Sequence, residues 1–168
     1  MKLFRNLFVA FALFTAFNTV QAQKVAHIDS EQLLMAMPET KAMETELKKV
    51  QQTYADEYNG QATALQAKLK KYDAEAATQT DAKNEERRAE VQALQQKIQK
   101  YGQTAEQEIQ KKRFDLLKPI VEKAQKAVKD VADAKGVQYV FDSSPGKGLI
   151  VFEKGEDLMP AVKTKLGI

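Results

Sequence analysis

The side chains that could do chemistry are few in this sequence of 168 residues. His27 is the only histidine and Asp29 follows two residues later, which supplies two potential metal ligands where a zinc site needs three or four. The absence of cysteine excludes thiolate catalysis, disulfides and cysteine-ligated metals. We therefore interpret His27 as a structural residue of a strand and predict no metal and no cofactor.

The three serines do not form a nucleophile motif. Ser30, Ser143 and Ser144 all lie outside a Gly-x-Ser-x-Gly sequence. The run 145–148, Pro-Gly-Lys-Gly, resembles a phosphate-binding loop only superficially, because the first glycine and the hydroxyl residue after the lysine are missing. We interpret 143–148 as a hairpin turn. The many carboxylates alternate with lysines on predicted helical faces, which is typical of solvated surface, so we predict that the protein is not an enzyme.

The first 22 residues have the pattern of a secretory signal peptide. Lys2 and Arg5 form a short basic region, and an apolar stretch over 7–17, interrupted by Thr15 alone, follows them. Such a stretch is too short to span about 30 Å of hydrocarbon as a helix. The small residues Val20 and Ala22 predict cleavage between Ala22 and Gln23, and hence export to the periplasm.

Removal of the signal peptide changes the composition that the whole sequence shows. The 43% hydrophobic content includes five of the eight phenylalanines within the first 17 residues, and the formal charge of +3 includes Lys2 and Arg5. A nearly neutral mature chain cannot neutralise the phosphates of a nucleic acid, so we predict no nucleic-acid partner. The pairs and triplets of basic residues at 87–88 and 111–113 indicate at most a peripheral contact with anionic lipid.

The middle of the chain, residues 39–118, is predicted to form two long helices. Apolar residues recur there at intervals of three and four, with a shift in phase near Tyr54–Ala62. The apolar residues of the first half, taken in rising order, can be paired with those of the second half, taken in falling order. The two residue numbers of a pair then add up to 159 or 160, as for Val50 with Ile109 and Leu69 with Val91. A constant sum predicts an antiparallel helical hairpin with its tip near 79–80 and Asp81 as a cap of the returning helix. Each arm would reach roughly 60 Å. The predicted seam comprises Val50, Tyr54, Tyr58, Leu65, Leu69, Leu94, Ile98, Tyr101 and Ile109.

Two pairs of helix-disrupting residues also lie at mirrored positions in the two halves, with residue numbers that add up to nearly the same sum. Pro38 and Pro119 lie where the arms would meet the head, and Gly60 and Gly102 lie halfway along the arms. We consider Gly60 and Gly102 as candidate hinges, with tolerated exposed positions as the alternative.

The remaining segments, 23–38 and 119–168, are predicted to form a small strand-containing head. Strands are expected at 24–28, 137–142 and 149–153, a short helix at 31–37 behind a cap at Asp29 or Ser30, a cap at Gly136, and a closing helix at 157–166. The fold class is thus α+β, with a β-rich head and a hairpin arm. So small a head, poor in aromatic residues and without a disulfide, is marginal as an isolated unit, which favours oligomerisation.

The order of these elements and several local segments resemble the periplasmic chaperone family Skp/OmpH. The matching segments are 24–29, 31–34, 116–121, 135–142, 148–152 and 157–166. The sequence departs from that family at the arm tip, which carries mixed charge rather than strongly basic charge, and at 157–159, which reads Asp-Leu-Met. The resemblance implies a homotrimer whose heads join and whose arms surround a cavity. It also implies an ATP-independent holdase for unfolded outer-membrane proteins. Val25, Ile28, Val140, Ile150 and Phe152 are then the expected core of the trimeric head.

Two other classes of function remain open at this point. A long helical hairpin could serve as a structural spacer or adaptor of the cell envelope. Alternatively, the basic clusters could make the protein an accessory factor that binds lipid or lipopolysaccharide.

Overall fold

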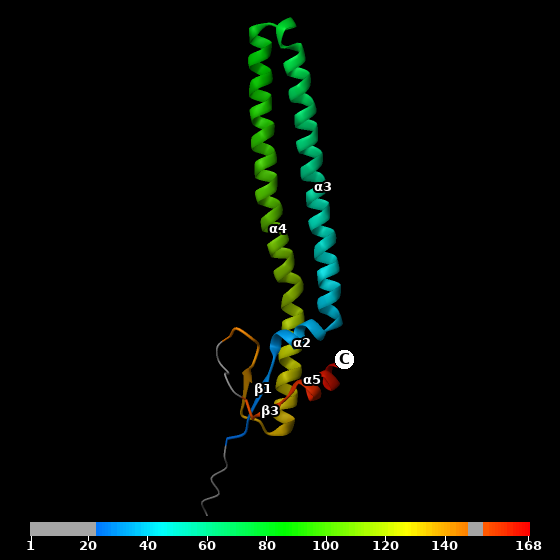
Figure 1. The fold of residues 1–168 in the computed structure, drawn as a ribbon, viewed down its shortest axis with the longest axis vertical. Coiled ribbons are helices and arrows are strands. Elements are labelled where there is room, and N and C mark those ends of the chain that lie inside the picture. Colours follow the sequence, from blue (N-terminus) through cyan, green and yellow to red (C-terminus); the bar gives the residue numbers. More distant parts are fainter. Residues whose placement is uncertain (1–22, 148–152) are drawn as a thin grey trace, which may run out of the picture.

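The computed structural model describes residues 23–147 and 153–168, which form a small head and a long two-helix arm (Figure 1). The predicted signal peptide, including Ala22, and most of the strand expected at 149–153 lie outside the described residues. The elements, in chain order, are β1 (Val25–Ile28), α2 (Ser30–Ala36), α3 (Pro38–Glu75), a 3-10 turn (Ala76–Thr78), α4 (Asp81–Lys135), β2 (Tyr139–Asp142), β3 (Glu156–Asp157) and α5 (Met159–Leu166).

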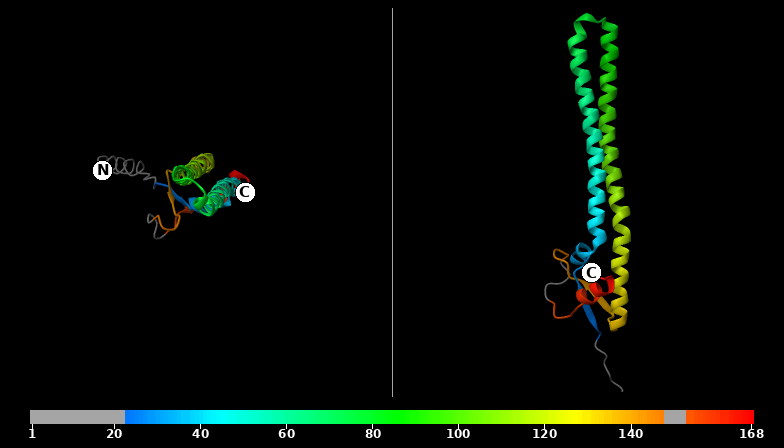
Figure 2. Two further views of the ribbon diagram at one scale, coloured as in Figure 1. Left: turned by 90° about the horizontal axis from the view of Figure 1, so that it is seen from above. Right: turned by 90° about the vertical axis from the view of Figure 1, so that its right-hand side faces the viewer.

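The arm consists of α3 and the first part of α4, which run side by side in opposite directions in Figure 1 and in the right-hand view of Figure 2. At about 1.5 Å per residue, the 38 residues of α3 extend over roughly 57 Å. The antiparallel helical hairpin predicted from the mirrored apolar residues is confirmed.

The tip of the arm is closed by side-chain caps. Thr80 is the N-cap of α4 and its Oγ1 accepts a hydrogen bond from the backbone N–H of Lys83 at 3.3 Å. The Asn84 amide donates to the carbonyl oxygen of Ala76 at 2.9 Å and ties the start of the 3-10 turn to the first turn of α4. The expectation that Asp81 is the cap was wrong by one residue, because a threonine with extended backbone precedes it and Asp81 lies in the first helical turn.

Helix α4 belongs to both parts of the molecule. Its 55 residues run without interruption from the tip to the far end of the head, with Pro119 inside the helix. Proline lacks the N–H that would continue the hydrogen-bond ladder, and its ring crowds the carbonyl of the residue four positions earlier, so Pro119 is a local cost that the packing of α4 against the head must offset. Gly136 ends the helix with φ 66°, a left-handed conformation that favours glycine, as the sequence predicted.

A short break separates α2 from α3. Asp29 caps α2 by accepting from the N–H of Gln32 at 2.8 Å. Met37, which precedes Pro38, has an extended backbone because a residue before proline is disfavoured in the helical region. Pro38 then occupies the first turn of α3, where its missing N–H has no cost.

The head contains a three-stranded parallel sheet in the order β2-β1-β3. Val25 is opposite Tyr139, and Ala26 is opposite both Val140 and Glu156. The strand β3 was not predicted, and the closing helix begins at Met159 rather than at Asp157, because Asp157 pairs with His27 and its carboxylate accepts from the N–H of Met159 at 2.8 Å. β2 begins two residues later than expected.

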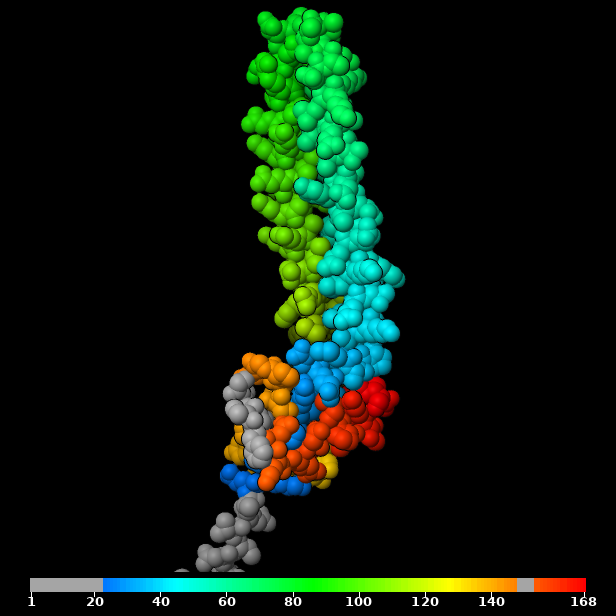
Figure 3. Space-filling model, viewed as in Figure 1, coloured from blue at the N-terminus to red at the C-terminus, as the bar shows by residue number. Residues whose placement is uncertain are grey.

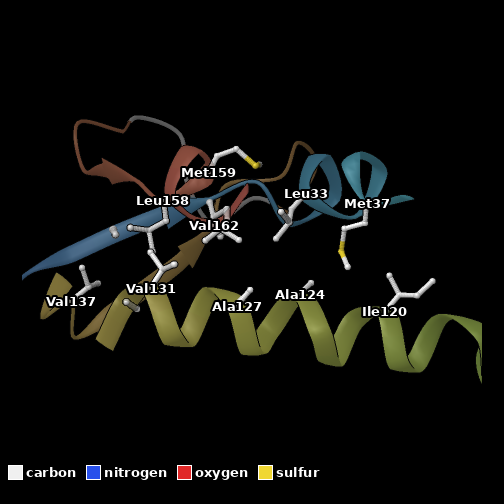
Figure 4. Packing of buried hydrophobic residues seen from close by; sticks show 13 residues of the cluster. Leu33, Met37, Ile120, Ala124, Ala127, Val131, Val137, Leu158, Met159 and Val162 are labelled. Atoms are coloured by element: carbon white, nitrogen blue, oxygen red, sulfur yellow. The ribbon is translucent and has the colours of Figure 1, made fainter. Parts of the chain in front are cut away.

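The core of the head lies between α4 on one side and β1, α2 and α5 on the other (Figure 4). Leu158 and Val162 are completely buried, and Leu33 and Met37 are 1% exposed. Small residues on α4, notably Ala124 and Ala127, allow that helix to approach these side chains closely. The arm contributes almost nothing to this core.

None of the helices within 23–147 and 153–168 combines the length and the apolar character that crossing a membrane requires.

Candidate functional site

Contacts between the two arm helices follow the mirrored numbering. Glu46 with Lys112 and Lys68 with Glu90 each add up to 158, while Glu39 with Lys123 and Glu75 with Arg87 each add up to 162. These sums lie within one helical turn of the predicted 159 or 160. These ion pairs therefore lie close to the register that was predicted for the apolar pairs.

The predicted seam residues all lie on α3 or α4, but few of them are buried. Tyr58 and Leu69 are 42% and 39% exposed, and Ile98 is the one seam residue that is buried. The remaining seam residues are half-buried, namely Val50, Tyr54, Leu65, Leu94, Tyr101 and Ile109. α3 contains no buried residue at all. On the face that Figure 3 shows, no other element covers the two helices of the arm. Much of the apolar surface of the arm is therefore accessible to a partner.

Halfway along the arm, Tyr101 links the two helices. Its ring lies 6.1 Å from that of Tyr54, centroid to centroid, and its hydroxyl donates to the Glu57 carboxylate. This hydrogen bond raises the pKa of Tyr101 to about 12, with burial as a smaller cause, so the phenol stays protonated and remains a donor. The link lies beside Gly102, one of the two candidate hinges.

The surroundings of the two glycines allow an alanine at each. No atom outside the helix backbone lies within 4 Å of a Cβ built on Gly60, and a Cβ on Gly102 would meet Tyr58 Cε2 at an ordinary 3.5 Å. We expect Gly60→Ala to stabilise the arm by about 1 kcal/mol, because alanine restricts the unfolded chain and favours a helix. Thermal unfolding of Gly60→Ala against wild type measures this gain.

The hinge function itself is tested with the Gly60→Ala/Gly102→Ala variant. Spin labels at the tip and at the base of the arm report the spread of distances between them. A narrower distribution in the variant supports hinges at these positions, whereas an unchanged distribution shows that the glycines are merely tolerated.

The outer face of the head sheet carries exposed apolar side chains. Val25, Tyr139 and Phe141 are 43%, 53% and 47% exposed, and the pairing of β1 with β2 places them together on the face opposite α4. Ala26 and Ile28 alternate with them and point into the core. Three neighbouring apolar side chains on one face of a marginal head are a candidate contact surface.

A groove of about 730 Å³ runs along the edge of the head beside this face. Its apolar lining comes from α2, α4 and β2, and includes Leu34, Val121, Val128, Val140 and Phe141. Lys147 and Asp142 add charged groups to the lining.

The residues that could do chemistry are engaged in structural contacts. His27 is half-buried, with Nδ1 3.1 Å from a carboxylate oxygen of Glu153 and 3.3 Å from Ser143 Oγ. Asp142 accepts hydrogen bonds from Ser30, Ser144 and Lys147, which join the β2 end to the start of α2. Burial opposes the charge of Asp142, but these three donors together outweigh it and hold its pKa well below the ordinary range. Among the described residues, no group of three or more potential ligands could hold a metal ion.

The residues expected in the trimeric head have different surroundings. Ile28 is buried in the core of its own chain, Val140 packs partly against that core, and Val25 is exposed. Ile150 and Phe152 lie outside the described residues, and Gln23 is exposed at the start of them. Tyr139 and Phe141 were missed, although the alternation in Tyr139-Val140-Phe141-Asp142 could have identified the outer face.

A slender helical arm on a small head, with its apolar surface only half covered, is the architecture of a protein that acts by binding rather than by catalysis. The family model for "Outer membrane protein (OmpH-like)" matches residues 24–166. The chain therefore belongs to the OmpH/Skp-like family, a periplasmic family of non-enzymatic chaperones.

The fold has a counterpart among solved structures. A crystal structure from Caulobacter crescentus CB15, described as a candidate outer membrane chaperone that is OmpH-like, superposes with a TM-score of 0.75 at 22% sequence identity. The match covers 86% of this chain and 84% of the other. No significant match was found among curated proteins. At this identity the likeness supports the fold, and the family match carries the assignment.

Proposed function

We propose that the chain is an ATP-independent periplasmic holdase that keeps unfolded outer-membrane proteins from aggregating. Three copies would join through their heads and hold a client in the cavity between their arms, after removal of residues 1–22. The observation that carries this proposal is the arm, whose 38-residue helix α3 has no buried residue. A surface that is apolar but thinly spread can bind unfolded chains without aggregating by itself.

The charge pattern of the arm supports weak and reversible binding. Lysines and carboxylates alternate along both helices and form exposed ion pairs, such as Lys83–Glu86 and Arg88–Glu85. Exposed pairs of this kind contribute little free energy and leave no strong field of one sign. Several weak apolar contacts on different arms would together hold one client, because each bound arm raises the effective concentration of the others. Since each contact is weak and reversible by itself, release of the client needs no nucleotide.

The outer face of the sheet supports assembly through the head. Val25, Tyr139 and Phe141 are the exposed apolar residues of β1 and β2, and a groove lined by Phe141 and Val140 adjoins them. Covering such a face with a second copy would supply the apolar burial that a small head lacks.

The test is suppression of aggregation. A urea-unfolded outer-membrane β-barrel protein is diluted with a slight trimer excess of the mature chain, and light scattering is followed. We expect scattering to fall several-fold for wild type. We expect it to stay high for Tyr139→Glu/Phe141→Glu, because charges on the sheet face would prevent assembly of the arms around one client.

The control is Met35→Glu, which places a glutamate on an exposed residue of α2 outside the sheet face. It should suppress aggregation like wild type and run as a trimer in light-scattering mass measurements. A wild-type protein that fails to suppress aggregation contradicts the holdase function, and a monomeric wild type contradicts the shared cavity.

A further inference from the structure

The tip of the arm contains an open groove of its own, between the last turns of α3 and the first turns of α4. Its volume is about 560 Å³, within the range of roughly 300–1,000 Å³ that ligand sites occupy. The lining is mainly apolar, with Leu69, Tyr72, Ala76 and Val91, and the other lining residues are polar or charged. Leu69 is 39% exposed, so the apolar part is accessible from solvent.

One side of this groove is Arg87, whose guanidinium is incompletely satisfied. Its carbon Cζ lies 4.5 Å from the centre of the Tyr72 ring, and Nη2 donates to Glu75 at 2.6 Å. Nη1 is buried and has no hydrogen-bond partner among the described residues. A buried donor without an acceptor is costly, so an oxygen atom that enters the groove would be bound favourably.

A second set of contacts holds Tyr72 in place. The Glu90 carboxylate accepts from the ammonium of Lys68 and from the hydroxyl of Tyr72. These hydrogen bonds, that of Lys68 first, lower the pKa of Glu90 and keep it charged. Because Tyr72 is thus held from behind, its ring and the Arg87 stacked on it form a fixed wall of the groove.

The polar part of the lining fits a neutral segment better than an anionic headgroup. Arg88 already pairs with Glu85 at 2.6 Å, and Asp73 contributes a carboxylate to the lining. A phosphate would meet that carboxylate and would find a single buried donor nitrogen without a partner, Nη1 of Arg87. A single carbonyl oxygen next to an apolar side chain matches one donor nitrogen beside apolar lining residues.

We propose that this tip groove binds a short apolar segment of an unfolded polypeptide. The client's side chain contacts Leu69 and Val91, and a backbone carbonyl oxygen accepts from Nη1 of Arg87. The inference rests on the proposed holdase function and adds that each arm has a binding site of its own, apart from the shared cavity. Three such sites in one assembly would hold a long client at several points at once.

The experiment uses the full mature chain with a photo-crosslinking phenylalanine at one position at a time. Gln95 lines the groove, whereas Gln99 has the same residue type one turn closer to the head and does not line it. Ala93 lies on another face of the same helix. The probes are a urea-unfolded outer-membrane β-barrel protein and a 12-residue peptide with a central Leu-Phe pair, compared with the same peptide carrying Ser-Ser.

We expect crosslinking at Gln95 to exceed that at Gln99 and Ala93 about fivefold, and to be lost with the Ser-Ser peptide. Arg87→Lys keeps the charge but removes the planar guanidinium, and we expect it to lower the crosslink yield at least threefold. The peptide comparison involves no change of the protein, so it holds even if Arg87→Lys disturbs the tip.

Equal yields at all three positions, with aggregation still suppressed, would overturn the tip site and leave the holdase function intact. Loss of both crosslinking and suppression would contradict the holdase function itself. Displacement of the peptide from Gln95 by phosphatidylglycerol vesicles would overturn the choice of a polypeptide as the ligand and favour a lipid.

Discussion

Replacing Leu33 by alanine should unfold the head at temperatures where the wild type is stable. Leu33 is 1% exposed and lies in the centre of the cluster that joins α2, α4 and α5. Large-to-alanine changes at such positions cost about 2–5 kcal/mol, since they remove burial and leave a cavity. A whole domain is commonly stable by only about 5–15 kcal/mol, so this loss is a large fraction of the total. Urea unfolding followed by circular dichroism measures it.

The control for this change is on the same helix. Met35 is 67% exposed, so Met35→Ala should change the unfolding free energy by less than about 0.5 kcal/mol. We also expect Leu33→Ala to reduce trimer formation, because the outer sheet face is held in place by the core beneath it. Equal stability of the two variants would show that the core of the isolated chain does not determine the stability of the head.

The arm could be predicted from sequence in considerable detail, for a physical reason. An antiparallel helical hairpin depends on the period of the apolar residues along each helix and on the register between the two helices. Both can be read from the spacing of residues such as Leu69 and Val91. The head was harder, because its strands have four residues or two and pair across more than a hundred residues of chain. The two-residue strand β3 carries too little pattern to be recognised, and its pairing with His27 moved the start of α5 to Met159.

Side-chain networks were beyond the sequence altogether. The groove at the tip depends on Arg87 stacking on Tyr72. The spacing of residues in the sequence does not show whether a basic side chain stacks on an aromatic ring or extends into solvent. The same holds for Asp142, which the sequence presents as one of 23 acidic residues and the structure shows as the acceptor of hydrogen bonds from three side chains.

Asp142→Asn should destabilise the head by about 2–3 kcal/mol at neutral pH. The Asp142 carboxylate accepts from Ser30 Oγ at 2.6 Å, from Ser144 Oγ at 2.5 Å and from Lys147 Nζ at 2.6 Å. An asparagine would lose the charge and turn an N–H group towards these donors. Removing an ionised acceptor from a part-buried network leaves several donors unsatisfied, each at a substantial cost.

The pH dependence provides the sharper test of this role. Because the pKa of Asp142 is lower in the folded protein than in the unfolded chain, its stabilisation is complete above the ordinary value of about 3.9 and is lost as the pH falls below it. We therefore expect the gap in unfolding free energy between wild type and Asp142→Asn to be widest near pH 7 and to narrow below about pH 4. Glu85→Gln, which removes an exposed ion pair at the tip, should show a small and nearly constant gap. A gap for Asp142→Asn that does not narrow in acid would mean that the carboxylate's charge is not what joins β2 to α2.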